Sequence, residues 1–269
     1  MSTENDILQD DSKSGRGCAL GCLALFLLIT VLPAFPPVKL SLIEAGVRSS
    51  SRAIQGSAVK AAWKQGKAGQ QILARVFPEA DASLRTEILL HLHEVQGTDV
   101  QKQGFPEPFL SLVPELLEVA ATTESRWVTQ NLDRGLRIAA TPEAYGQALL
   151  TRLTTLKTDS NSGAHGRELA ELAGTLPDKG RAVVLSRFDA IPGARHRERF
   201  LDSLMAKRPK RFGPATRAAI RASWPRWAEA DRDHVMALCR QLGVVPAPLD
   251  ELASPMSESN SKAKAPERK

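Results

Sequence analysis

One uncharged apolar segment near the N-terminus constrains this chain more than any other feature of its sequence. Residues Cys18 to Phe35 form an eighteen-residue run without a charged side chain. As an α-helix this run would span about 27 Å, close to the hydrocarbon thickness of a bilayer. Pro33 stands late in the run and Pro36 and Pro37 follow it, so the helix should end there, because proline cannot continue it. We therefore predict a single N-terminal transmembrane helix over residues 18–35.

A cleaved signal peptide is the alternative interpretation of this segment. Lys13 and Arg16 would form its basic region, and Leu32 to Ala34 an imperfect cleavage site. The apolar run is longer than most signal-peptide cores, and its prolines fit a peptidase cleft poorly, which favours the anchor. Basic residues flank the segment on both sides, so the side of the membrane that holds the rest of the chain stays open.

The sequence after this segment predicts an all-α fold. Apolar residues recur at helical spacing, and no stretch alternates apolar and polar residues over the length of a strand. The stripes are Leu84, Ile88, Leu92 and Val95; Phe109, Val113, Leu116, Leu117 and Ala120; Val128, Leu132, Leu136 and Ala139; Leu149, Leu150, Leu153 and Leu156; Leu169, Leu172, Ala173 and Leu176; Val184, Leu185, Phe188 and Ile191; Phe200, Leu201, Leu204 and Met205; and Val235, Leu238, Cys239 and Leu242. These stripes predict at least eight helices.

Prolines at regular intervals suggest that the helices repeat. They recur about every 35 residues, the length of one helix pair in a solenoid: Pro106 or Pro108, Pro142, Pro177, and Pro209 or Pro214. A similarity between residues 115–122 and 168–175 gives a competing offset of 53 residues. We therefore expect stacked helical hairpins after the transmembrane helix, and an α-solenoid-like arrangement and an irregular helical bundle both remain open.

Composition divides the chain into five segments. Residues 36–77 contain seven basic residues against one acidic residue and few apolar positions, so we expect a basic juxtamembrane stalk that buries little. Residues 78–252 would form the helical domain. A short polar leader, residues 1–17, precedes the transmembrane helix, and residues 253–269 have the Ser, Lys and Pro composition of a disordered tail.

The sequence offers no convincing catalytic, metal or cofactor site. His91 and His93 would point about 200° apart on a helix, which disfavours a shared metal. His165 and Glu168 share a helical face, but His165 follows a glycine-containing turn, where a capping or surface role is more common. Recognisable phosphate-loop, dinucleotide and nucleophile-elbow motifs are missing from the sequence. Cys239 is expected to be a small buried apolar residue.

The most distinctive charged region spans residues 194–232, with eleven basic and four acidic residues. At its centre, Lys207, Arg208, Lys210 and Arg211 lie between two predicted helices, where they could contact phosphates or acidic groups. Trp224 and Trp227 follow, and they would either stack on a ligand or pack into a core. An ordinary solvated surface is the alternative for the basic residues.

These features favour a membrane-anchored helical scaffold or protein-interaction module without catalytic activity. Its partners would be the membrane lipid bilayer and another protein, with Lys207 to Arg211 as the contact for an anionic group. The alternative function is binding of anionic lipid headgroups or nucleic acid through residues 194–232, with nucleic acid as the less favoured ligand. The formal charge of +6 is consistent with either function.

Overall fold

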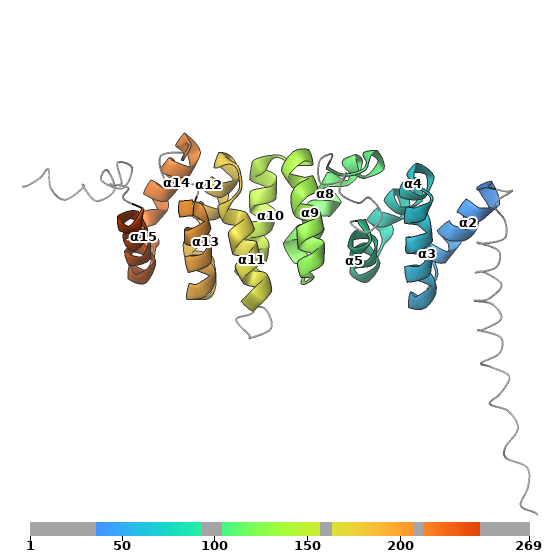
Figure 1. Ribbon diagram of the computed structural model, residues 1–269, viewed down its shortest axis with the longest axis horizontal. Coiled ribbons are helices and arrows are strands. Elements are labelled where there is room, and N and C mark those ends of the chain that lie inside the picture. The colour runs from blue at the N-terminus through green and yellow to red at the C-terminus, as the bar shows by residue number, and fades with distance from the viewer. Residues whose placement is uncertain (1–35, 93–103, 157–162, 207–211, 243–269) are drawn as a thin grey trace, which may run out of the picture. The chain divides into compact units, whose positions relative to one another are not determined.

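The computed structural model describes residues 36–92, 104–156, 163–206 and 212–242. These residues form α-helices and short 3-10 turns without any strand, which confirms the predicted all-α fold for this part of the chain (Figure 1). They divide into two compact units. Unit 1 comprises residues 36–92 and 106–112, and unit 2 comprises residues 104–105 and the described residues from 113 onward.

The predicted transmembrane segment, Cys18 to Phe35, lies outside the described residues, as do the leader 1–17 and the tail 253–269. Among the helices that the structure does describe, none is both long enough and apolar enough to cross a bilayer. The membrane helix over residues 18–35 thus stays a prediction.

The described residues of unit 1 form four short α-helices and two 3-10 turns. They are α2 (Pro36–Val47), α3 (Arg52–Lys64), α4 (Lys67–Val76), η1 (Phe77–Glu79), α5 (Ala82–Leu90) and η3 (Glu107–Leu112). The helices α2, α3 and α4 contact one another, while α5 packs on α3 and η3 packs on α4. Gly66 separates α3 from α4 with a φ of 60°, a left-handed conformation that glycine adopts readily.

Trp63 lies at the centre of unit 1. Its side chain is fully buried, and its indole Nε1 donates a hydrogen bond to the Ile88 carbonyl at 3.1 Å. The Trp63 ring stacks on Phe109 with 5.6 Å between centroids, and Phe77 meets Phe109 edge-on at 6.1 Å. Side chains from α3, η1 and η3 therefore share one aromatic core.

The expectation that residues 36–77 form a stalk that buries little is wrong. Val59, Trp63 and Phe77 are fully buried, and the core they form extends past residue 77, so the boundary expected at residues 77 and 78 falls inside unit 1. The apolar residues are few, but three short helices turn them toward one centre. Arg48 and Lys67 also pair with acids outside the stretch, at 2.7 Å in each case.

Replacement of Trp63 by Ala should lower the free energy of unfolding of unit 1 by about 3–5 kcal/mol, because it removes a buried ring and leaves the Ile88 carbonyl without its donor. Lys60→Ala, an exposed change on the same helix, is the matched control and should have little effect. Urea denaturation monitored by circular dichroism measures both. Equal, small effects of the two changes would contradict this account of the core.

Unit 2 contains eight α-helices in its described residues. They are α8 (Val113–Thr122), α9 (Arg126–Ala139), α10 (Pro142–Thr155), α11 (Gly163–Gly174), α12 (Asp178–Ser186), α13 (Ala194–Ala206), α14 (Pro214–Ser223) and α15 (Glu229–Gln241), with 3-10 turns η4 (Phe188–Ala190) and η6 (Trp224–Arg226). Each helix packs on the helix two places further along the chain. The first layer is therefore α8, α10, α12 and α14, and the second layer is α9, α11, α13 and α15 (Figure 1).

This arrangement of helix pairs explains the proline interval seen in the sequence. Pro142 and Pro214 are the first residues of α10 and α14, and Pro177 directly precedes α12, so the three prolines mark successive starts in the first layer. The Thr141 hydroxyl also accepts a hydrogen bond from the Ala144 amide at 3.3 Å, as expected of a capping residue. The 53-residue offset instead relates α8 to α11, which belong to different layers, so it is not the structural repeat.

Most of the predicted apolar stripes form the cores of the two units. In unit 2 the fully buried side chains include Leu116, Leu136, Leu153, Leu169 and Phe200. Leu242 is an exception, since its side chain is 47% exposed at the end of the described chain. Val95 lies outside the described residues.

Close backbone contact between α10 and α12 depends on two glycines. A Cβ atom on Gly146 would lie 2.5 Å from the Gly180 carbonyl oxygen, and one on Gly180 would lie 2.6 Å from the Pro142 carbonyl oxygen. Both distances are shorter than van der Waals contact with backbone atoms that cannot move aside easily. The first layer therefore tolerates only glycine at these two positions without separating its helices.

Gly146→Ala should lower the free energy of unfolding of unit 2 by about 1–3 kcal/mol, because the added methyl group forces α10 away from α12. Alanine normally stabilises a helix relative to glycine, so the sign is diagnostic. Gly163→Ala is the control, since a Cβ there meets nothing within 4 Å, and it should be neutral or stabilising. Thermal denaturation distinguishes the two, and stabilisation by both changes would contradict the proposed contact.

Candidate functional site

The predicted anionic contact, Lys207, Arg208, Lys210 and Arg211, lies outside the described residues and stays a prediction. The residues that follow it are tightly held. Phe212 is buried and its ring lies 5.6 Å from the Arg181 guanidinium carbon. The Asp178 carboxylate accepts hydrogen bonds from the amides of Ala215 at 3.0 Å and Thr216 at 3.1 Å. The first turn of α14 therefore already holds an intramolecular carboxylate.

The two tryptophans after this region have a structural role. Trp227 is buried, its ring centroid lies 4.5 Å from that of Phe188, and its Nε1 donates to the Ser223 hydroxyl at 3.0 Å. Trp224 packs on Trp227 at 5.1 Å. Core packing, rather than stacking on a ligand, is the interpretation that the structure supports for Trp227.

The described histidines and the buried cysteine do not assemble into a metal site. His91 lies 3.1 Å from Glu87, His234 lies 2.9 Å from Asp202, and His196 bonds to the Pro192 carbonyl. In the part of the chain that the structure describes, no three His, Cys, Asp or Glu side chains converge as metal ligands, and His93 lies outside that part. Cys239 is buried as expected, and burial raises the pKa of its thiol.

His165 does not have the capping or surface role expected from its position after a glycine. The side chain is buried, and its Nε2 lies 3.0 Å from the Thr129 hydroxyl, across the contact between α11 and α9. Burial, and then the positive charge of Arg152, lower the pKa of His165. The folded protein therefore holds this imidazole in its neutral form more strongly than the unfolded chain does.

The lowered pKa of His165 predicts that unit 2 loses stability in mild acid. As the pH falls below about 6.5, the unfolded chain takes up a proton that the folded state resists, so the folded state is destabilised until the pH reaches the lowered folded pKa. His165→Gln removes this group and should reduce the difference in unfolding free energy between pH 7.5 and pH 5. Urea titrations at both pH values test this, and an unchanged difference would show that His165 does not contribute.

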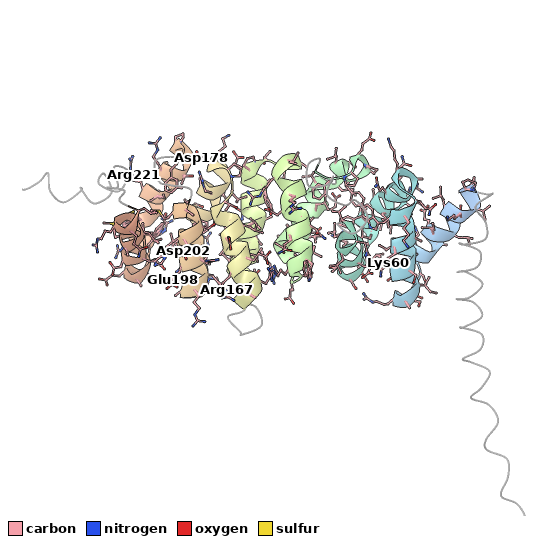
Figure 2. All side chains as sticks on the ribbon, in the orientation of Figure 1. Lys60, Arg167, Asp178, Glu198, Asp202 and Arg221 are labelled. Atoms are coloured by element: carbon pink, nitrogen blue, oxygen red, sulfur yellow. The ribbon has the colours of Figure 1, made fainter. Side chains whose placement is uncertain are left out.

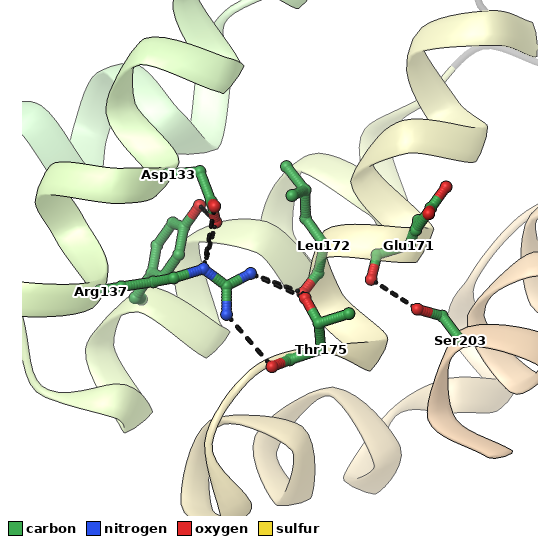
Figure 3. Close-up of polar contacts among 7 residues, drawn as sticks. Asp133, Arg137, Glu171, Leu172, Thr175 and Ser203 are labelled. Atoms are coloured by element: carbon green, nitrogen blue, oxygen red, sulfur yellow. Dashed lines mark hydrogen bonds and ion pairs between the residues drawn. The ribbon is translucent and has the colours of Figure 1, made fainter. Parts of the chain in front are cut away.

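The Arg137 guanidinium is the centre of the most extensive polar cluster in the described part of unit 2. Its Nε donates to both oxygens of Asp133 at 2.9 Å, and its Nη atoms donate to the carbonyls of Leu172 and Thr175 and to the Thr175 hydroxyl (Figure 3). The Tyr145 hydroxyl donates to Asp133 at 2.8 Å. Burial and the Asp133 charge raise the pKa of Tyr145. Arg137 thus joins α9 to the end of α11, and its neighbours occupy the donors that a ligand would need.

Ion pairs connect consecutive helices of the second layer. Glu168 on α11 pairs with Arg126 on α9 and accepts a hydrogen bond from Gln130. The next pairs are Arg199 with Glu171 at 3.4 Å, between α13 and α11, and His234 with Asp202 at 2.9 Å, between α15 and α13. Asp202 is labelled in Figure 2. Apart from Glu168, whose side chain is 16% exposed, these charges are exposed or half-exposed, and such pairs contribute modestly to stability.

One line of exposed side chains on α9 takes no part in these ion pairs between helices. Trp127 is 67% exposed and Ile138 is 62% exposed, and Arg134 is exposed between them. Positions 127, 134 and 138 share one face of the helix, whereas Leu132 and Leu136 are buried on the opposite side. We call Trp127, Arg134 and Ile138 the α9 stripe. Trp and Arg are among the residue types that most often dominate protein interfaces.

No family model, curated protein or solved structure matches the chain. The signal of the α9 stripe was present in the sequence, because Trp127 and Ile138 are out of phase with the core stripe Val128, Leu132 and Leu136. Large apolar residues that lie outside the buried face of a helix are candidates for a surface that contacts another molecule.

Proposed function

We propose that the protein is a membrane-anchored helical scaffold that binds another protein through the α9 stripe. The observation that carries this proposal is the exposure of Trp127 and Ile138 on one face of one helix, in line with Arg134. The described residues have five exposed large apolar side chains, and the other three, Val38, Leu110 and Leu242, lie on other segments. A single exposed apolar residue is ordinary, but two on one line with an arginine resemble an interface anchor.

The fold of unit 2 supports this function. Helical hairpins that stack on their neighbours present a continuous outer surface, and such arrays serve mostly as binding scaffolds. The ion pairs of the second layer fix its helices against one another, so the α9 stripe lies on a surface that is already ordered. A partner with an apolar groove and a carboxylate would complement the two apolar side chains and Arg134.

The membrane part of the proposal depends on Cys18 to Phe35. Eighteen residues without a charge are sufficient to cross the hydrocarbon core as a helix, and the prolines at their end mark its limit. A chain anchored there would begin unit 1 directly at the lipid surface, since α2 starts at Pro36.

Site-specific photocrosslinking in intact cells tests both parts of the proposal. A benzoylphenylalanine in place of Trp127 should give a discrete protein adduct, and Arg134→Glu with Ile138→Ser should reduce its yield about tenfold or more, as expected for an interface anchor. Thr151, exposed on α10 in the first layer, is the control position for the crosslinker and should give no such adduct. The adduct should remain in the membrane fraction after extraction with alkaline carbonate.

Two outcomes would contradict this proposal. Equal adducts from positions 127 and 151, or an adduct that is insensitive to the changes at Arg134 and Ile138, would exclude the α9 stripe as the interface. Release of the whole chain by carbonate would exclude the anchor without bearing on the stripe.

Binding of an anionic surface is a second candidate, favoured by the charge of residues 207–226. This stretch holds seven basic residues and no acidic residue. Within it, Arg217, Arg221 and Arg226 are exposed, and Arg221 on α14 is labelled in Figure 2. Binding of the full chain to anionic vesicles or to DNA would weaken steeply with added salt under this function, whereas crosslinking through the α9 stripe would change little.

A further inference from the structure

The chain enters unit 1 at an end where three of its helices begin or finish. Two ion pairs with the same separation of 31 residues join α2 to α4 and to the turn after α4: Glu44 with Arg75, and Arg48 with Glu79. Their equal offset shows that α2 and α4 run in the same direction. The helix between them runs the opposite way, because Arg52 at the start of α3 lies 4.0 Å from Asp81, beyond the end of α4. Pro36 therefore lies at the same end of unit 1 as the end of α3 and the start of α4, and we call residues 36–39 and 60–67 the entry end.

The uncompensated positive charge of unit 1 lies at this entry end. Every carboxylate described in unit 1 has a basic or histidine partner: Glu44 with Arg75, Glu79 with Arg48, Asp81 with Arg52, Glu107 with Lys67, and Glu87 with His91. Arg85 donates instead to the carbonyls of Phe77 and Pro78. The basic residues that remain form no ion pair with the described part of the chain, and all belong to the entry end: Lys39, Lys60 and Lys64.

Side chains, rather than helix dipoles, give the entry end its charge. The N-termini of α2 and α4 and the C-terminus of α3 lie there, so helix ends of both signs are mixed. Lys60 and Lys64 are exposed and lie four residues apart on one face of α3, and Lys60 is labelled in Figure 2. Val38, next to Lys39 on α2, is 48% exposed. The entry end therefore combines positive side chains with an exposed apolar one.

The segment attached to the entry end identifies its partner. Pro36 directly follows Cys18 to Phe35, the predicted transmembrane helix, so an anchored chain would meet the lipid headgroups with this end. Lysine carries its ammonium group on a long apolar stem, which suits the boundary between hydrocarbon and water. Lysines next to a membrane are also attracted to anionic lipids. Position and charge thus agree on one partner.

We propose that Lys39, Lys60 and Lys64 bind anionic lipid headgroups in the membrane that holds the anchor. This contact rests on the anchor of the proposed function and is independent of the α9 stripe. Unit 1 then touches the membrane through the lysines as well as through the segment that precedes Pro36. The contact is also distinct from the basic residues 207–226, whose described arginines belong to unit 2.

Lysine footprinting of the full chain in vesicles tests this contact. The chain is reconstituted into phosphatidylcholine alone and into phosphatidylcholine mixed with phosphatidylserine, and acetylation of each lysine is followed by mass spectrometry. Lys39, Lys60 and Lys64 should react several-fold more slowly in the presence of phosphatidylserine, because its headgroups hold their ammonium groups. Added salt should remove this protection. Lys179, exposed on α12 and paired with Glu143, is the control position and should react equally in both membranes.

Two pairs of exposed substitutions show which surface is responsible. Lys60→Gln with Lys64→Gln should return the acetylation of Lys39 to its rate in phosphatidylcholine, because one lysine alone holds the entry end weakly. Arg217→Gln with Arg221→Gln, changes on α14 of unit 2, should leave the protection of the entry end unchanged. Equal acetylation in both membranes, or protection of Lys39 that persists without the charges at positions 60 and 64, would overturn the contact.

Flotation with phosphatidylcholine vesicles separates the contact from the anchor. These lipids carry no net charge, so a chain that floats with them at high salt is held by its apolar segment alone. Failure to float would overturn the anchor and, with it, the lipid contact of the lysines. Flotation together with equal acetylation in both membranes would overturn the lysine contact and leave the anchor in place.

Discussion

Contact between helices two places apart in the chain organises everything else in unit 2. Each hairpin gives one helix to each layer, so every helix must approach its equivalent in the next hairpin closely. Gly146 and Gly180 allow the backbones of α10 and α12 to meet. Gly174 does the same between α11 and α13, since a Cβ there would lie 2.9 Å from the Phe200 carbonyl oxygen. The repeat therefore depends on glycines, which allow close backbone contact, as much as on apolar side chains.

Polar groups then fix the register of these contacts. The Arg137 guanidinium binds the last carbonyls of α11, where a positive charge also complements the helix dipole. The Asp178 carboxylate binds the first amides of α14, where a negative charge complements the positive end of that helix dipole. Burial alone would raise the pKa of the Asp178 carboxyl, but hydrogen bonds from Thr216 and Ala215 lower it. The α9 stripe differs from these groups, because Trp127 and Ile138 are exposed to solvent and do not fix the register of the helices.

The sequence predicted the features that depend on local periodicity. Buried positions such as Leu136, Leu153 and Phe200 follow from helical spacing alone, and the starts of α10 and α14 follow from proline and its capping neighbours. The burial of residues 36–77 could not be predicted, because their core residues are spread over three short helices, each too short to show a full apolar stripe. Contacts such as that of Trp63 with Phe109 join residues far apart in the chain, and no local pattern encodes them.

A membrane anchor would reduce the contact area that the α9 stripe needs in order to bind a partner. Specific complexes in solution usually bury about 1,200–2,000 Å², and a line of three side chains supplies only a fraction of this area. If Cys18 to Phe35 holds the chain in a bilayer, a partner in the same membrane is confined to a thin layer beside it, and the effective concentration rises as it does for tethered binding modules. A small apolar contact with one charge is then sufficient for association. Confinement to a membrane is therefore consistent with a small contact surface, because the raised effective concentration compensates for the small contact area.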